Sequence, residues 1–182
     1  MAKGLWTSTF VGGFIAWLWM LVSWTVLPWH CGVMESFPNE KAAVEAINLQ
    51  TMGSGIYAYP NQCKSESMVS RTKIFLSINK NVQESGMIIS QVISLVTYFI
   101  GSLLITLIIM QMASNNYGWK LFATTMIGLV IGVMSFLPAW NWSGFPFNFV
   151  LLMIADNVIA WFLAGFVIAG FIRPRHHHKK GS

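Results

Sequence analysis

Four long apolar stretches with almost no charge constrain the fold of this chain more than any other feature. They run from Leu5 to Leu27, from Met87 to Met112, from Leu121 to Leu137 and from Phe147 to Ile172. Crossing a hydrocarbon core of roughly 30 Å takes about 20 helical residues. Because backbone polar groups in lipid need partners within their own segment, each stretch is predicted to be a transmembrane helix.

Composition excludes the main alternatives. Only 9% of the 182 residues are charged, which excludes an ordinary soluble domain. The net charge of +5 is not gathered into a basic stripe, so no nucleic-acid partner is expected. The apolar runs do not alternate as the strands of a β-barrel do. The first stretch is too long and too rich in tryptophan for a cleaved signal peptide, and we interpret it as a retained helix.

The basic residues indicate the orientation. Arg173, Arg175, Lys179 and Lys180 follow the last stretch, whereas the connector 138–146 carries no charge. The positive-inside rule therefore predicts that both termini and the tail 173–182 are cytoplasmic, and that residues 28–86 are external.

The external segment is predicted to form a small α+β cap. Asn39 is a suitable N-cap for a helix that begins at Glu40, and Gly55–Tyr59 and Thr72–Ile78 have the pattern of strands. So small a unit is marginal alone and should pack on the outer ends of the spans. The predicted fold is an all-α membrane protein: a four-helix transmembrane bundle with this cap between its first two spans, and residues 1–182 forming one membrane domain.

Both cysteines, Cys31 and Cys63, lie in the external segment. An exported loop meets an oxidising compartment, so a Cys31–Cys63 disulfide is one interpretation and two free thiols are the other. Only His30 is near them, and no CxxC or HxxxH spacing occurs. We therefore predict no metal site, and no sequence motif indicates a cofactor.

Three motifs carry a resemblance to a known group of proteins: Trp24 to His30 with its Leu-Pro pair, Pro38-Asn39-Glu40, and Gly55-Ile56-Tyr57-Ala58-Tyr59-Pro60. In these motifs the chain resembles a set of small bacterial inner-membrane proteins with four predicted spans. The resemblance covers about the first third of the chain. It implies a multi-pass protein of the bacterial inner membrane and adds no activity.

Asp156 is the one charged residue inside a predicted span, and burying it costs roughly 2.5–3.5 kcal/mol. It should face the bundle interior, at a depth similar to that of Ser94 and Tyr98 in the second span. Two interpretations fit. Asp156 with Asn157 binds a proton, a cation or a polar headgroup, or Asp156 is a buried carboxyl bonded to Tyr98 or Gln91 that fixes the helix register.

His30, Glu40 and Tyr57 are further candidates, because they lie in the resembling motifs and are expected to gather at the outer mouth of the bundle. A histidine beside a glutamate can perform acid–base chemistry. The alternative interpretation is that His30 anchors the chain at the headgroup level and Glu40 complements a helix dipole.

Small residues in the third span, including Gly128 and Gly132, allow close helix approach. They indicate either a seam inside the bundle or a dimer contact.

No catalytic residue is predicted, since no nucleotide loop, hydrolase elbow or metal motif is found. The leading hypothesis is a non-catalytic accessory or structural subunit of a larger membrane complex, with the lipid bilayer and other membrane subunits, or further copies of itself, as partners. The alternatives are a small proton- or ion-linked transporter that uses Asp156, and a membrane enzyme with an outer His30/Glu40 site.

Overall fold

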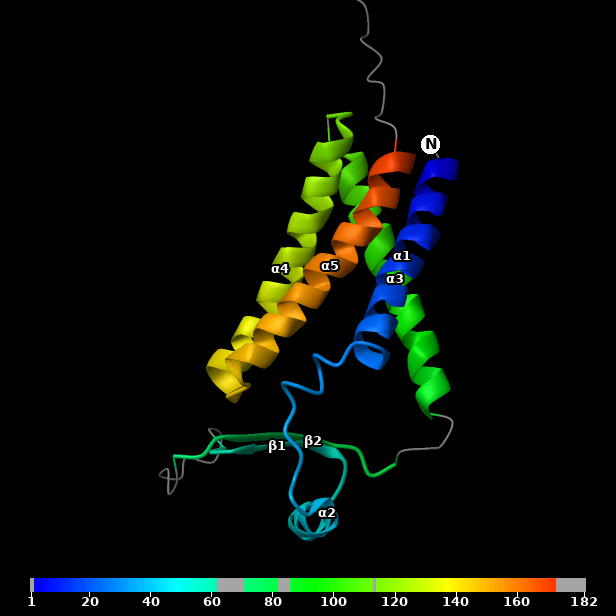
Figure 1. Ribbon diagram of the computed structural model, residues 1–182. Helices are drawn as coiled ribbons and strands as arrows, with labels where there is room; N and C mark the ends of the chain where they lie inside the picture. Colours follow the sequence, from blue (N-terminus) through cyan, green and yellow to red (C-terminus); the bar gives the residue numbers. More distant parts are fainter. Residues whose placement is uncertain (1, 62–70, 82–85, 113, 173–182) are drawn as a thin grey trace, which may run out of the picture.

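The computed structural model describes residues 2–61, 71–81, 86–112 and 114–172, and it is mostly helical (Figure 1). Four helices are long and apolar enough to cross a membrane: α1 (Ala2–Thr25), α3 (Gly86–Met110), α4 (Tyr117–Ser143) and α5 (Phe147–Phe171). They coincide with the four predicted spans, apart from the bounds of α4.

The helices pack in the order α3, α1, α5, α4, because α1 lies against both α3 and α5 while α4 lies mainly along α5. Small residues bring these helices together: Ala16, Ala160 and Ala164 are fully buried in the shared apolar core. Figure 1 shows the α1–α3 pair and the α4–α5 pair spreading apart toward one end of the molecule. The segment between α1 and α3 lies at that end.

The prediction for α4 was too short at both ends. The helix begins at Tyr117 because the Asn116 side chain accepts a hydrogen bond from Trp119 N, at 3.2 Å. It continues through Pro138 and ends at Gly144, whose φ of +77° suits glycine. Lys120 and Pro138 lie just outside the predicted stretch Leu121–Leu137, and so in its predicted connectors, but in the structure they belong to α4.

The described part of the segment between α1 and α3, residues 26–61 and 71–81, is called the cap below. It contains α2 (Glu40–Gln50) and an antiparallel pair of strands, β1 (Gly55–Tyr59) and β2 (Ile74–Ile78), in register Gly55 with Ile78. Asn39 caps α2 as predicted, since its side chain accepts from Ala42 N at 3.1 Å. Phe75 of β2 lies 6.2 Å from Phe145 in the α4–α5 turn, measured between ring centroids. The strand pair thus packs on the end of the α4–α5 pair, and α2 lies farther from the spans (Figure 1).

Candidate functional site

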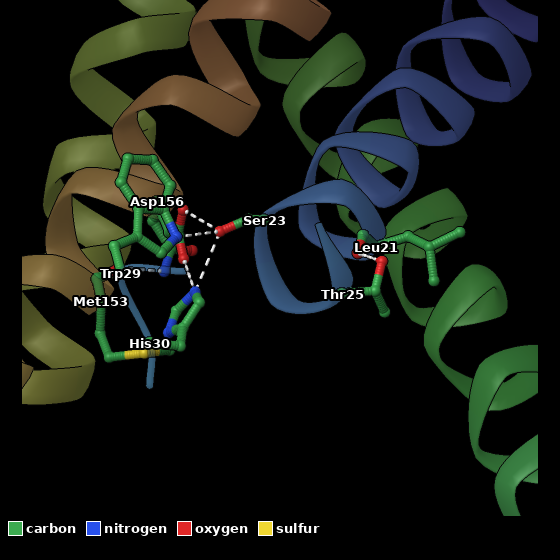
Figure 2. A network of polar contacts seen from close by, with 8 residues as sticks. Leu21, Ser23, Thr25, Trp29, His30, Met153 and Asp156 are labelled. Carbon is green, nitrogen blue, oxygen red and sulfur yellow. Dashed lines mark hydrogen bonds and ion pairs between the residues drawn. The ribbon is translucent and has the colours of Figure 1, made fainter. Parts of the chain in front are cut away.

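Asp156 lies on α5 and is fully buried, and its partners come from α1 and from the loop that follows α1 (Figure 2). Ser23 Oγ donates to Asp156 Oδ1 at 2.7 Å, and His30 Nε2 lies 2.9 Å from Asp156 Oδ2. Trp29 Nε1 donates to Ser23 Oγ at 3.0 Å. We call these four residues the Ser23 cluster.

The local sequence after α1 explains how His30 reaches α5. Pro28 cannot continue a helix because it lacks an N–H and clashes with the preceding turn. The chain turns at once, with Leu27 N bonded to Val22 O at 3.2 Å and Gly32 N bonded to Pro28 O at 3.2 Å. This turn returns Trp29 and His30 to the last turns of α1, and Figure 2 shows them meeting Ser23 and Asp156 there.

The hydroxyl of Ser23 is saturated. A serine hydroxyl has one proton to donate and two lone pairs that accept. Its proton goes to Asp156, and the lone pairs face the Trp29 indole N–H and His30 Nε2, each at 3.0 Å. Because the serine proton is already used, His30 Nε2 must carry the hydrogen of its contact. The network therefore assigns the proton of the imidazole to Nε2.

The contact between His30 and Asp156 is electrostatic more than directional. Oδ2 of Asp156 is at ion-pair distance but has no aligned hydrogen bond, and the second imidazole nitrogen, Nδ1, is buried without a partner among the described residues. Both atoms are therefore buried polar groups without a hydrogen-bond partner among the described residues.

Aromatic rings enclose the pair. The Trp24 ring stacks on the His30 ring with centroids 3.9 Å apart and planes 12° apart, and the Trp29 ring meets His30 edge-on at 6.2 Å. Ser23 and Asp156 are 0% exposed and His30 is 1% exposed. The site is therefore shielded from solvent, and electrostatic interactions within it are strong.

The geometry does not fit a nucleophilic triad. In such a triad the serine hydroxyl gives its proton to the histidine and the carboxylate holds the other ring nitrogen. Here the hydroxyl donates to the carboxylate, and both contact the same nitrogen, Nε2. Among the described residues no group of three His, Cys, Asp or Glu side chains is placed to hold a metal. The arrangement can hold α1, the loop after it and α5 together.

The residues expected around Asp156 are placed elsewhere. Asn157 Nδ2 donates to Met153 O, at 2.9 Å, and its backbone oxygen lies against Gly128 of α4. Tyr98 lies 6.2 Å from Trp161, centroid to centroid, and Tyr98 and Gln91 line a groove between α1 and α3. Neither of the two side chains is hydrogen-bonded to Asp156, so the predicted partners are replaced by Ser23 and His30.

The three residues expected at the outer mouth are not brought together. His30 is buried against α5, whereas Glu40 is exposed in the first turn of α2. The Tyr57 hydroxyl donates to Gly53 O at 2.9 Å, within the cap. An acid–base site that joins His30 to Glu40 is therefore absent from the structure.

The glycines of α4 face α5. A Cβ built on Gly128 lies 2.8 Å from Trp161 Cβ, and one built on Gly132 lies 3.0 Å from Ile154 Cα. This close approach is intramolecular, and it leaves no room at either glycine for a second copy of the chain.

Cys31 is exposed and free, and Cys63 lies outside the described residues. The predicted disulfide therefore has no support in the structure. The tail 173–182 also lies outside the described residues.

A buried cation was missed by the sequence analysis. Lys120 is 2% exposed, and its Nζ donates to Ile172 O at 2.7 Å and to Asn115 Oδ1 at 3.2 Å. It satisfies a carbonyl at the C-terminal end of α5, where a positive charge also complements the helix dipole.

Ser23 and Trp29 were missed as site residues as well. The one available signal was the proline five residues after Ser23, which forces a turn and returns Trp29 and His30 to the helix end. Nothing local in the sequence connects this turn with Asp156, which lies 133 residues away from Ser23.

The four apolar helices define a multi-pass membrane protein. No protein-family model, curated protein or solved structure matches this chain. The class of protein thus rests on the helices, and any activity must be argued from the sites.

Proposed function

We propose that this chain is a non-catalytic subunit of a larger membrane complex, one membrane domain with its termini in the cytoplasm and its cap outside the bacterial inner membrane. The observation that carries the proposal is the apolar surface of the cap. Leu49 is 85% exposed and Met52 104% exposed, and none of the residues of α2 is buried.

Lipid cannot cover this surface if the four helices cross the bilayer, because α2 lies beyond the ends of the helices (Figure 1). Apolar side chains of this size that project into water raise the free energy of the isolated chain, by about 25 cal/mol for each Å² left uncovered. In an accessory subunit, the external part of a different membrane protein would cover this apolar surface of the cap. The buried Ser23 cluster supports a non-catalytic role, because the Ser23 hydroxyl is saturated by its contacts with Asp156, Trp29 and His30 and is not free to attack a substrate.

The test is the size of the assembly extracted from native membranes in mild lipid particles. We expect the tagged chain to elute with a different membrane protein, and the double variant Leu49→Glu, Met52→Glu to elute without it. The matched control is Gln50→Glu, which adds a charge to the same exposed end of α2. A wild-type chain that elutes as a monomer, or only with copies of itself, contradicts the proposal.

A second function, proton-linked transport, is favoured by the His30–Asp156 pair. A carboxylate and an imidazole 2.9 Å apart and shielded from water can hold one proton more or one fewer. Proteoliposomes with a trapped pH-sensitive dye would report proton flux. Flux that is unchanged in Asp156→Asn and His30→Gln excludes this function.

A further inference from the structure

A groove between α1 and α3 lies on the cap side of the membrane-spanning region, beside the Ser23 cluster. It has a volume of about 170 Å³ and is lined from α1 by Trp17, Met20 and Trp24 and from α3 by Gln91, Ser94 and Tyr98. The steps of three or four residues place each set on one face of its helix. The volume is below the roughly 300–1,000 Å³ of pockets for drug-sized ligands, so the groove accommodates a single ring.

Of the polar side chains that line this groove, Thr25 of α1 donates to Leu21 O at 2.6 Å, whereas the three on α3 make no hydrogen bond among the described residues. Gln91, Ser94 and Tyr98 make no hydrogen bond to any described residue. Counted at about 1.5 Å per residue from the start of α3 at Gly86, Tyr98 lies roughly 18 Å along the helix, well inside a spanning segment. Polar groups at such depth are costly unless a partner satisfies them. A ligand that accepts hydrogen bonds would satisfy the donors of these three side chains.

The walls select among the molecules that dissolve in a membrane. No charged side chain lines the groove, so a phosphate or an amine headgroup has no counter-ion there. An acyl chain satisfies none of the three polar groups. The rings of Trp17, Trp24 and Tyr98 suit a flat ring that stacks, and the hydroxyl and amide groups suit ring carbonyls.

We propose that this groove binds the planar, carbonyl-bearing ring of a membrane quinone. The ring stacks among the aromatic side chains and accepts hydrogen bonds from the Tyr98 hydroxyl, the Ser94 hydroxyl or the Gln91 amide. Its hydrophobic tail lies along the lipid-facing surface beside Val92, which is exposed. Trp24 lines the groove and also stacks on His30, so the bound ring lies one side chain away from the buried His30–Asp156 pair.

Binding is measured by quenching of tryptophan fluorescence when decyl-benzoquinone is added to the protein in saturated phosphatidylcholine nanodiscs. We expect saturable quenching. Ser94→Leu fills the groove and should abolish saturation, while Thr97→Leu, which adds the same side chain at an exposed position of α3, should leave it unchanged. Tyr98→Phe removes one donor and keeps the ring, and it should weaken binding roughly 3- to 10-fold.

Linear quenching without saturation indicates quinone that is only dissolved in the lipid, and it overturns the proposal. Equal affinity in the Ser94→Leu and Thr97→Leu variants overturns it as well. Far-ultraviolet circular dichroism of each variant checks that the helices are intact. If Ser94→Leu does not fold, the Tyr98→Phe comparison decides, because a decrease in affinity supports the proposal and an unchanged affinity contradicts it.

Discussion

Replacement of Ser23 by alanine tests whether its hydroxyl holds α1, the loop after α1 and α5 together. The substitution removes the hydroxyl oxygen of a fully buried side chain. Alanine has a higher helix propensity than serine, so α1 itself is not weakened. Three contacts disappear: those with Asp156 Oδ1, Trp29 Nε1 and His30 Nε2. His30 keeps its 2.9 Å contact with Asp156 Oδ2, but the Trp29 indole N–H and one carboxylate oxygen lose their partners.

The magnitude follows from these three contacts. Hydrogen bonds between the helices of membrane proteins contribute about 0.6 kcal/mol each on average. The same value applied to the Asp156 contact and to the two loop contacts gives about 2 kcal/mol. A buried polar group left without a hydrogen-bond partner costs about 1–3 kcal/mol in proteins, so the loss of stability can exceed the sum of the three contacts. We therefore expect Ser23→Ala to lower the free energy of unfolding by about 2–4 kcal/mol.

The assay is equilibrium unfolding in mixed micelles, by titration with sodium dodecyl sulfate and detection of tryptophan fluorescence. Ser8→Ala is the matched control, because Ser8 is also on α1 and 0% exposed, yet its Oγ has no partner among the described residues. Removing that hydroxyl should be neutral or slightly stabilising. Equal effects of the two substitutions, or a loss below about 0.5 kcal/mol for Ser23→Ala, would refute the role assigned to Ser23.

Two further substitutions test the close contacts of α5. Gly128→Ala places a Cβ 2.8 Å from a side chain and 2.9 Å from a backbone oxygen of α5, so it should lower the free energy of unfolding by about 1–3 kcal/mol in the same assay. Gly170→Ala, whose Cβ approaches its nearest neighbour only to 3.9 Å, should be neutral or stabilising. Lys120→Met leaves the Ile172 carbonyl without its hydrogen-bond donor, so it should speed amide hydrogen exchange in the last turn of α5 about tenfold. The control is Lys41→Met at an exposed position, which should leave that exchange unchanged. Equal exchange in the two variants contradicts the capping role of Lys120.

The spanning helices were predictable from sequence because the lack of charge over about 20 residues has a direct physical cause in the bilayer. The cap helix was predictable for a local reason, the Asn39 side chain that bonds to Ala42 N. The ends of α4 were missed because Asn116 and Gly144 determine them by cap geometry, and hydropathy does not report caps. Lys120 was assigned to a connector for the same reason.

The partners of Asp156 were not predictable in this way. The position of Asp156 inside a span correctly indicated that its carboxyl group needs hydrogen-bond partners. Tyr98 and Gln91 were the expected partners because they lie on α3, which runs parallel to α5. Contacts of α1 with both α3 and α5 instead place α1 between them, so that α1 supplies the hydroxyl. Helix order is a property of the whole packing, and no pattern within one helix encodes it.

The position of the Ser23 cluster connects the burial of Asp156 with the attachment of the cap. The cluster lies where the two helix pairs spread apart, and its imidazole belongs to the loop after α1 with which the cap begins (Figures 1 and 2). Ser23, His30 and Asp156 are each at most 1% exposed, so water can reach the cluster only when the contact with α5 opens. That opening releases His30, and with it the start of the cap, from α5. Any access of water or a ligand to Asp156 is therefore coupled to movement of the loop after α1, whether the chain acts as a subunit or as a transporter.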